Sequence, residues 1–156
     1  MEIQLVYIVE GYKFKEYKNA NNFEEFIKNK NFKEYELRII VEAFKENLNN
    51  EDVEKIVKVG PDSSKMKLVL KGILDGLNVD FYTNKELTIE QMKAIIYGLI
   101  NNLKIEYYAN PKYTAEQMIE LIDGLEKGLD IKILQNEKLS VEEMKQIKNR
   151  LMKLKK

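Results

Sequence analysis

Apolar and polar residues follow a helical period in several stretches of the chain. The clearest stretch has apolar residues three or four positions apart, at Met118, Leu121, Ile122, Leu125 and Leu129. This spacing places them on one face of a helix. Thr114 and Gln117 form a capping box at its start, and Gly128 is expected to end it in a left-handed conformation. The pattern therefore predicts an amphipathic helix with defined ends.

The same pattern recurs at intervals of 26 residues. The methionines at its centre are Met66, Met92, Met118 and Met144, and the capping residues four positions earlier are Asp62, Thr88, Thr114 and Ser140. Gly72, Gly98 and Gly124 share a third position, where Arg150 breaks the series. A fixed period of this length is typical of stacked repeats. We expect the methionines to pack in the core, rather than to form a plastic binding groove, and the glycines to mark close packing rather than a phosphate loop.

A more divergent copy of the repeat precedes these four. When Leu37 is aligned with Met66, Ile40 and Phe44 take the places of Val69 and Ile73, with about three extra residues within 49–52. We therefore expect about five helical units over residues 31–156, with the first and last atypical because a terminal unit has one face in water. The connecting segments 79–87, 105–113 and 131–139 are too short for a second long helix. Each should hold a short helical turn.

The first 30 residues have a different pattern. Apolar residues alternate from Ile3 to Val9, and aromatic residues alternate with lysines from Tyr12 to Tyr17, after a Glu-Gly turn. This alternation predicts a β-hairpin, followed by a short connecting helix near Phe23 and Phe26. The predicted fold is mainly α: a solenoid-like stack of short helical repeats with an N-terminal β-hairpin cap over residues 1–30. That makes the protein α+β overall, in a single domain of residues 1–156.

Composition limits the function chiefly by exclusion. The 156 residues are 44% apolar and 33% charged, which suits one domain with a real core. There is no Cys and no His, so thiol chemistry, histidine bases and the usual zinc sites are excluded. Carboxylates are numerous, but no pair recurs at a spacing that indicates catalysis. We expect no enzyme activity, no metal and no cofactor.

Charge and hydropathy indicate where the protein acts. The 26 basic and 26 acidic residues balance, so no overall field attracts nucleic acid or an anionic membrane. No apolar stretch is long enough to span a bilayer, and the first residues lack a basic leader. We expect a cytoplasmic protein.

The segments 105–118 and 124–131 carry a resemblance to known sequences. They contain a Tyr-Ala-Asn-Pro turn, a Glu-Gln-Met helix start and a Gly-Leu-Glu-Lys-Gly-Leu-Asp helix end. This resembles a 26-residue helical repeat of uncharacterised phage and mobile-element proteins of low-GC Gram-positive bacteria. The match covers residues 37–151, although the other units lack the Tyr-Ala-Asn-Pro turn. The resemblance implies a bacterial host and no catalytic motif. In that setting, small non-enzymatic proteins often block host defence systems or regulate the mobile element.

Comparison between repeats selects candidate partner-binding residues. Tyr97 aligns with Lys71, Asp123 and Asn149. Ile119 aligns with Lys67, Lys93 and Lys145, so both apolar side chains should face water and could form a binding patch. Phe81, Tyr107 and Ile133 share a turn position and are further candidates, with inter-repeat packing as the alternative.

Three functional hypotheses follow. The first is a non-enzymatic protein-binding module, such as an inhibitor of a host defence complex, for example a CRISPR effector. The second is a nucleic-acid or nucleotide binder that uses a basic C-terminal end. Its candidate residues are Lys145, Lys148, Arg150 and Lys153. The alternative for these basic residues is that they are solvated surface charge without a binding role. The third is a self-associating scaffold.

Overall fold

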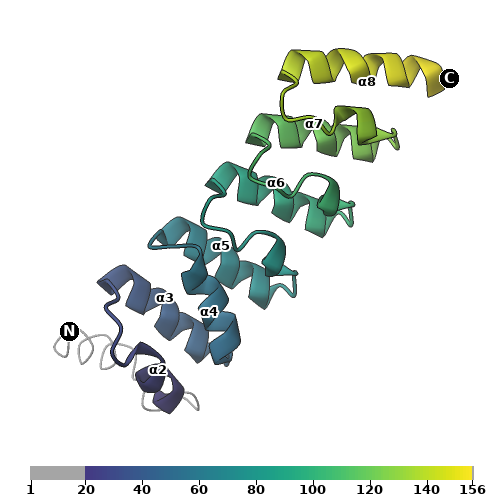
Figure 1. Ribbon diagram of the computed structural model, residues 1–156. Helices are drawn as coiled ribbons and strands as arrows, with labels where there is room; N and C mark the ends of the chain where they lie inside the picture. Colours follow the sequence, from purple (N-terminus) through teal and green to yellow (C-terminus); the bar gives the residue numbers. More distant parts are fainter. Residues whose placement is uncertain (1–19, 156) are drawn as a thin grey trace. The chain divides into compact units, whose positions relative to one another are not determined.

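The computed structural model describes residues 20–155, which form helices joined by loops, without a strand among them (Figure 1). The seven α-helices are α2 (Ala20–Ile27), α3 (Glu34–Lys45), α4 (Asn50–Lys58), α5 (Ser63–Leu74), α6 (Ile89–Ile100), α7 (Ala115–Glu126) and α8 (Val141–Lys155). Three short 3-10 helices separate the last four: η2 (Val79–Phe81), η3 (Ile105–Tyr107) and η4 (Ile131–Leu134). The predicted helical turns between the repeats are therefore confirmed.

The predicted α+β class is wrong, because the described chain is built from helices. The hairpin expected within residues 1–17 lies outside the described residues. In the described part, a helix covers the first repeat: Phe23, Phe26 and Ile27 of α2 are buried. The rings of Phe23 and Phe26 meet the ring of Phe44 in α3 edge to face, with centroids 6.1 and 5.7 Å apart. Aromatic packing between α2 and α3 therefore covers the first repeat, which is the role expected of the hairpin cap.

The chain divides into two compact units, residues 1–85 and 86–156. In the described part of the first unit, α3 packs against α2, α4 and α5. The extra residues predicted near position 50 belong to α4, a full helix where the later repeats have a 3-10 turn. Asn49 caps α4 by accepting a hydrogen bond from the Asp52 backbone amide at 2.8 Å, and Val53 and Ile56 are fully buried.

In the second unit, α6, α7 and α8 pack side by side in sequence order (Figure 1). Met92, Met118 and Met144 at their centres are 0% exposed, as is Met66 in the first unit. The predicted methionine core is confirmed. Met in this position fills space between neighbouring helices and is not available for a partner.

The capping residues also link consecutive repeats. Thr88 and Gln91 form the predicted capping box, as do Thr114 and Gln117. The amide nitrogen of Gln117 continues to the next loop, donating to the carbonyl oxygens of Glu137 and Leu139 at 2.9 and 2.8 Å. Gln91 makes the corresponding bonds one repeat earlier. In α8, Glu143 retains the cap with Ser140 but has no side-chain N–H to donate.

The glycines are positions of close packing, as predicted. A β-carbon at Gly98 would overlap the Tyr108 hydroxyl, and one at Gly124 would lie 2.8 Å from a methyl group of Ile131. The Tyr108 hydroxyl donates to the Ala94 carbonyl oxygen at 3.0 Å, which holds the ring in this space. Gly128 has φ 67°, the left-handed conformation expected at the end of α7.

Candidate functional site: a groove between α6 and α7

Tyr97 and Ile119, the two residues selected from the repeat comparison, lie in one groove of about 520 Å³. Helix α6 contributes Glu90, Lys93, Ala94 and Tyr97, and helix α7 contributes Ile119, Ile122, Asp123 and Glu126. Ala94 and Ile122 are 8% and 7% exposed and form an apolar floor. Tyr97 and Ile119 are 45% and 56% exposed, so both face water as predicted.

A hydrogen bond across the groove holds Tyr97 in place. Its hydroxyl donates to the Oε1 atom of Glu126 at 2.5 Å, joining the last turns of α6 and α7. This hydrogen bond, together with the negative charge of Glu126, raises the pKa of Tyr97 above its usual value. The aromatic side chain is thus fixed at its polar tip while much of it stays accessible.

The equivalent groove one repeat later, between α7 and α8, has different chemistry. It measures about 410 Å³ and is lined by Ile119, Glu120, Asp123, Lys127, Lys145, Lys148 and Asn149. Glu120 and Lys148 occupy the positions that Ala94 and Ile122 hold in the first groove. The Lys148 ammonium lies 2.5 Å from Glu120 Oε2 and 2.5 Å from Asp123 Oδ2. An internal ion cluster therefore takes the place of the apolar floor.

The Lys148–Glu120 pair within the ion cluster is nearly closed to solvent. The side chains of Lys148 and Glu120 are 7% and 10% exposed, and that of Asp123 is 36% exposed. Burial alone lowers the pKa of Lys148, but hydrogen bonds to Asp123 and Glu120 outweigh it and hold the pKa above its usual value. Burial likewise raises the pKa of Asp123, but bonds from Lys127 and Lys148 outweigh this and keep it low.

The predicted basic patch at the C-terminal end needs correction at Lys148. This residue is 6% exposed and its charge is neutralised by two carboxylates, so it cannot contribute to a phosphate-binding surface. Lys145, Arg150 and Lys153 are exposed. Counting charges along the sequence missed this burial, although the alignment of Lys148 with the apolar Ile122 carried the signal.

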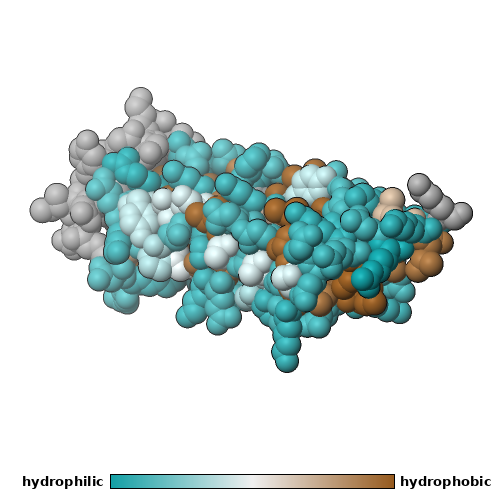
Figure 2. Space-filling view, turned by 90° about the horizontal axis from the view of Figure 1, so that it is seen from above, coloured by the Kyte–Doolittle hydropathy of each residue, from teal (hydrophilic) through white to brown (hydrophobic). Residues whose placement is uncertain are grey.

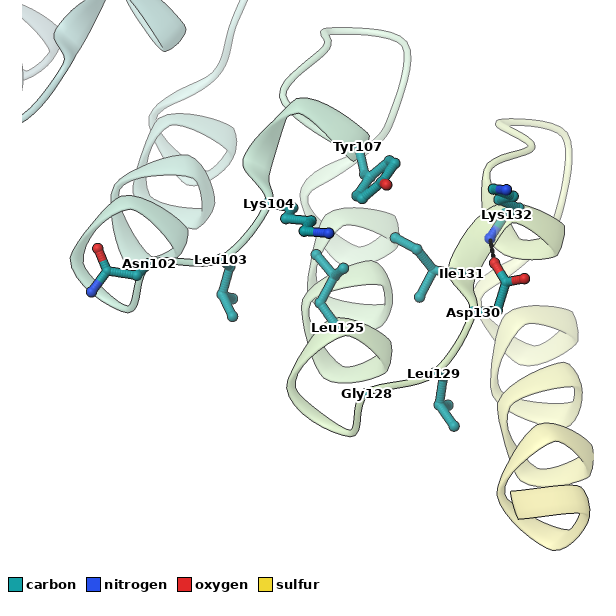
Figure 3. Close-up of a pocket in the computed structure, with 10 residues that line it drawn as sticks. All are labelled: Asn102, Leu103, Lys104, Tyr107, Leu125, Gly128, Leu129, Asp130, Ile131 and Lys132. Carbon is teal, nitrogen blue, oxygen red and sulfur yellow. Dashed lines mark hydrogen bonds between the residues drawn. The ribbon is translucent and has the colours of Figure 1, made fainter.

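The other candidates lie elsewhere. Phe81 belongs to the first unit and is 38% exposed, whereas Ile133 in the second unit is 59% exposed. Tyr107 is half-buried and lines a separate pocket of about 380 Å³, which Figure 3 shows together with Leu125 and Ile131. The Tyr107 carbonyl oxygen accepts a hydrogen bond from the Gln135 side chain at 3.0 Å. The residue thus takes part in packing between repeats.

Exposed apolar side chains are more numerous in the second unit. It carries Tyr97, Ile100, Ile119, Ile133 and Leu154, against Leu74 and Phe81 in the described part of the first. On the face drawn in Figure 2, brown apolar surface is seen chiefly toward the right, over the later repeats. Within residues 20–155 there is no cluster of three or more acidic residues that could hold a metal ion.

No family model, curated protein or solved structure matches the chain. The resemblance to mobile-element repeats therefore stays a prediction. In the described part of the chain, no helix is long and apolar enough to cross a membrane.

Proposed function

We propose that this chain is a non-enzymatic protein-binding module that receives an apolar segment of a partner protein in the α6–α7 groove. The observation that carries the proposal is the contrast between two equivalent grooves. One has an ion cluster as its floor, whereas the other has an apolar floor and two exposed apolar side chains at its edge. Repeat equivalents of these side chains are charged or polar, and Ile119 also borders the α7–α8 groove, so it is the combination of both side chains with an apolar floor that distinguishes the α6–α7 groove.

The groove has the features of an interface centre. Tyr97 offers a large amphipathic surface, and such residues contribute strongly to binding energy when a partner excludes water from them. Its hydrogen bond to Glu126 orders the ring before binding, which reduces the entropy lost in the complex. Ile119 and the floor residues supply apolar area beside it.

The repeat structure disfavours the scaffold hypothesis at α8. Gln91 and Gln117 donate to carbonyl oxygens of the following loop, but Glu143 would place a carboxylate against such oxygens. A second copy that continued the stack there would meet this repulsion. The resemblance to mobile-element repeats makes a host defence complex, for example a CRISPR effector, the first partner class to test.

Capture from lysate of a defence-carrying host, compared between matched baits, tests the proposal. A double variant, Tyr97→Lys with Ile119→Lys, removes the apolar edge. It should leave the fold intact, because Lys71 and Lys67 are the equivalents in the α5 repeat. The control, Leu154→Lys, removes an apolar side chain that is 83% exposed and outside the groove.

A protein captured by the unmodified chain and the control, but lost from the double variant, supports the proposal. The captured amount should fall about tenfold or more, as expected for the loss of central apolar anchors. Equal capture by the folded double variant would reject the groove as the binding site.

A further inference from the structure

We infer that the α6–α7 groove recognises an arginine side chain of the partner. Its aliphatic stem would lie on the apolar floor, and its guanidinium would lie between the Tyr97 ring and the Glu126 carboxylate. This inference rests on the proposed function and deepens it by naming the chemical group that the groove accepts.

The charges along the groove leave the Glu126 carboxylate without an opposing cation. The lining includes Glu90, Asp123 and Glu126 against Lys93. Asp123 is neutralised by Lys127 and Lys148, at 2.8 and 2.5 Å. Glu90 is in the first turn of α6, where the positive end of the helix dipole stabilises it, and Lys93 follows three residues later. Glu126 is at the other end of the groove, where no cation among residues 20–155 lies within ion-pair distance of it.

The ends of the two helices strengthen this negative potential. Tyr97 is in the last turn of α6, and Glu126 is the last residue of α7. Helix C-termini carry partial negative charge and favour a nearby cation. Neither α6 nor α7 has a basic residue in its last turn, whereas α5 has Lys71 and α8 has Lys153 and Lys155. Lys155 donates to the Lys127 carbonyl oxygen on the α8 side. Lys127, the C-cap residue of α7, has its ammonium on Asp123 at 2.8 Å, so the Glu126 carboxylate is left for an external cation.

The geometry at this end suits a guanidinium. Tyr97 bonds to Glu126 Oε1, which leaves Oε2 as an acceptor for a charge-assisted N–H bond. A planar guanidinium can also stack on the exposed tyrosine ring, which a lysine ammonium does less well. The three-carbon stem of arginine would cover Ala94 and Ile122 on the floor. Aromatic face, carboxylate and apolar floor together select a cation on an aliphatic stem.

The test uses the full chain and defined probes. N-acetyl-arginine methylamide is titrated while the Tyr97 ring and Ile119 methyl signals are followed by NMR. The neutral analogues are the corresponding citrulline and norleucine derivatives. We expect saturable shifts with the arginine probe and affinity about fivefold or more weaker for citrulline, because citrulline keeps the shape but loses the charge.

Matched variants assign the effect to Glu126. Glu126→Gln keeps the size of the side chain and should remove the preference for arginine over citrulline. Glu116→Gln, on the same helix but outside the groove, should leave the preference unchanged. Equal affinity of arginine and citrulline, an unchanged preference in Glu126→Gln, or no saturable shift with arginine would overturn the inference. The first two outcomes leave the apolar groove, and hence the proposed function, in place, because that function is tested separately by the Tyr97 and Ile119 variants.

Discussion

The ion cluster between α7 and α8 gives the sharpest prediction about stability. The repeat itself supplies the substitution, because Glu120 and Lys148 stand where Ala94 and Ile122 stand one repeat earlier. Changing Lys148→Ile alone leaves Glu120 buried without a cation. Changing Glu120→Ala alone leaves Lys148 with Asp123 as its remaining carboxylate. The double variant, Glu120→Ala with Lys148→Ile, recreates the apolar pair of the first groove.

The three variants should differ in a defined order. Removing one partner of a buried ion pair typically costs about 3 to 5 kcal/mol. Lys148→Ile should fall near the lower end, at about 3 kcal/mol, since Asp123 keeps its bond to Lys127 and is partly exposed. Glu120→Ala should cost about 1 to 2 kcal/mol, because Asp123 still pairs with Lys148. The double variant should lie within about 1 kcal/mol of the unmodified chain, because apolar replacement of a buried pair is often neutral or stabilising.

Urea unfolding at pH 7 measures these free energies, with the methyl signals of Met118 and Met144 as probes on the two helices involved. Because the chain contains two units, such local probes report the α7–α8 region specifically. The exposed pair Lys112–Glu137, outside the ion cluster, provides the control, and Lys112→Ala should cost less than about 1 kcal/mol. A double variant as unstable as Lys148→Ile would refute the view that the charges, and not the packing, determine the cost.

The remaining predictions concern the core, the caps and pH. Met118→Ala should cost about 2 to 5 kcal/mol in denaturant unfolding, whereas exposed Lys93→Ala should cost almost nothing; equal costs would contradict the methionine core. Thr114→Ala should lower stability by about 1 kcal/mol in thermal melts, and an unchanged midpoint would refute the capping box. The lowered pKa of Asp123 contributes stability above its unfolded pKa of about 3.8, which is lost as pH falls through the lower folded pKa. The raised pKa of Lys148 contributes stability below about 10.5, which is lost as pH rises through the higher folded pKa. Acid and alkaline titrations of unfolding should therefore show a plateau between these limits, and Asp123→Asn should reduce the acid-side loss.

The repeat register explains which parts of the fold could be predicted. Met92, Met118 and their capping residues recur at a fixed period, so burial and helix starts follow from alignment. Helix α4 was not predicted because few residues in the sequence indicate it: Asn49 caps it, and only Val53 and Ile56 within it are fully buried. With three extra residues in the alignment, a nine-residue helix resembles a loop insertion.

The same register explains the outcome for the site. Tyr97 and Ile119 were identified because their equivalents are mostly charged, and the groove brings them together as neighbours across two helices. Glu126 was missed, since nothing in the sequence shows that the Tyr97 hydroxyl reaches it across the groove. Lys148 was assigned to the surface on its charge alone. Its repeat position, which places it opposite Glu120, was not considered.

Site-specific photo-crosslinking tests most directly whether the α6–α7 groove binds a protein. A benzophenone amino acid is placed at position 93, which is exposed and lines the α6–α7 groove but not the α7–α8 groove, or, as control, at position 154 outside both. Each protein is irradiated in lysate of a defence-carrying host. We expect one discrete crosslinked protein from position 93, absent from position 154 and suppressed by an excess of unmodified chain. No adduct from position 93, or the same adduct from both positions, would contradict binding in this groove.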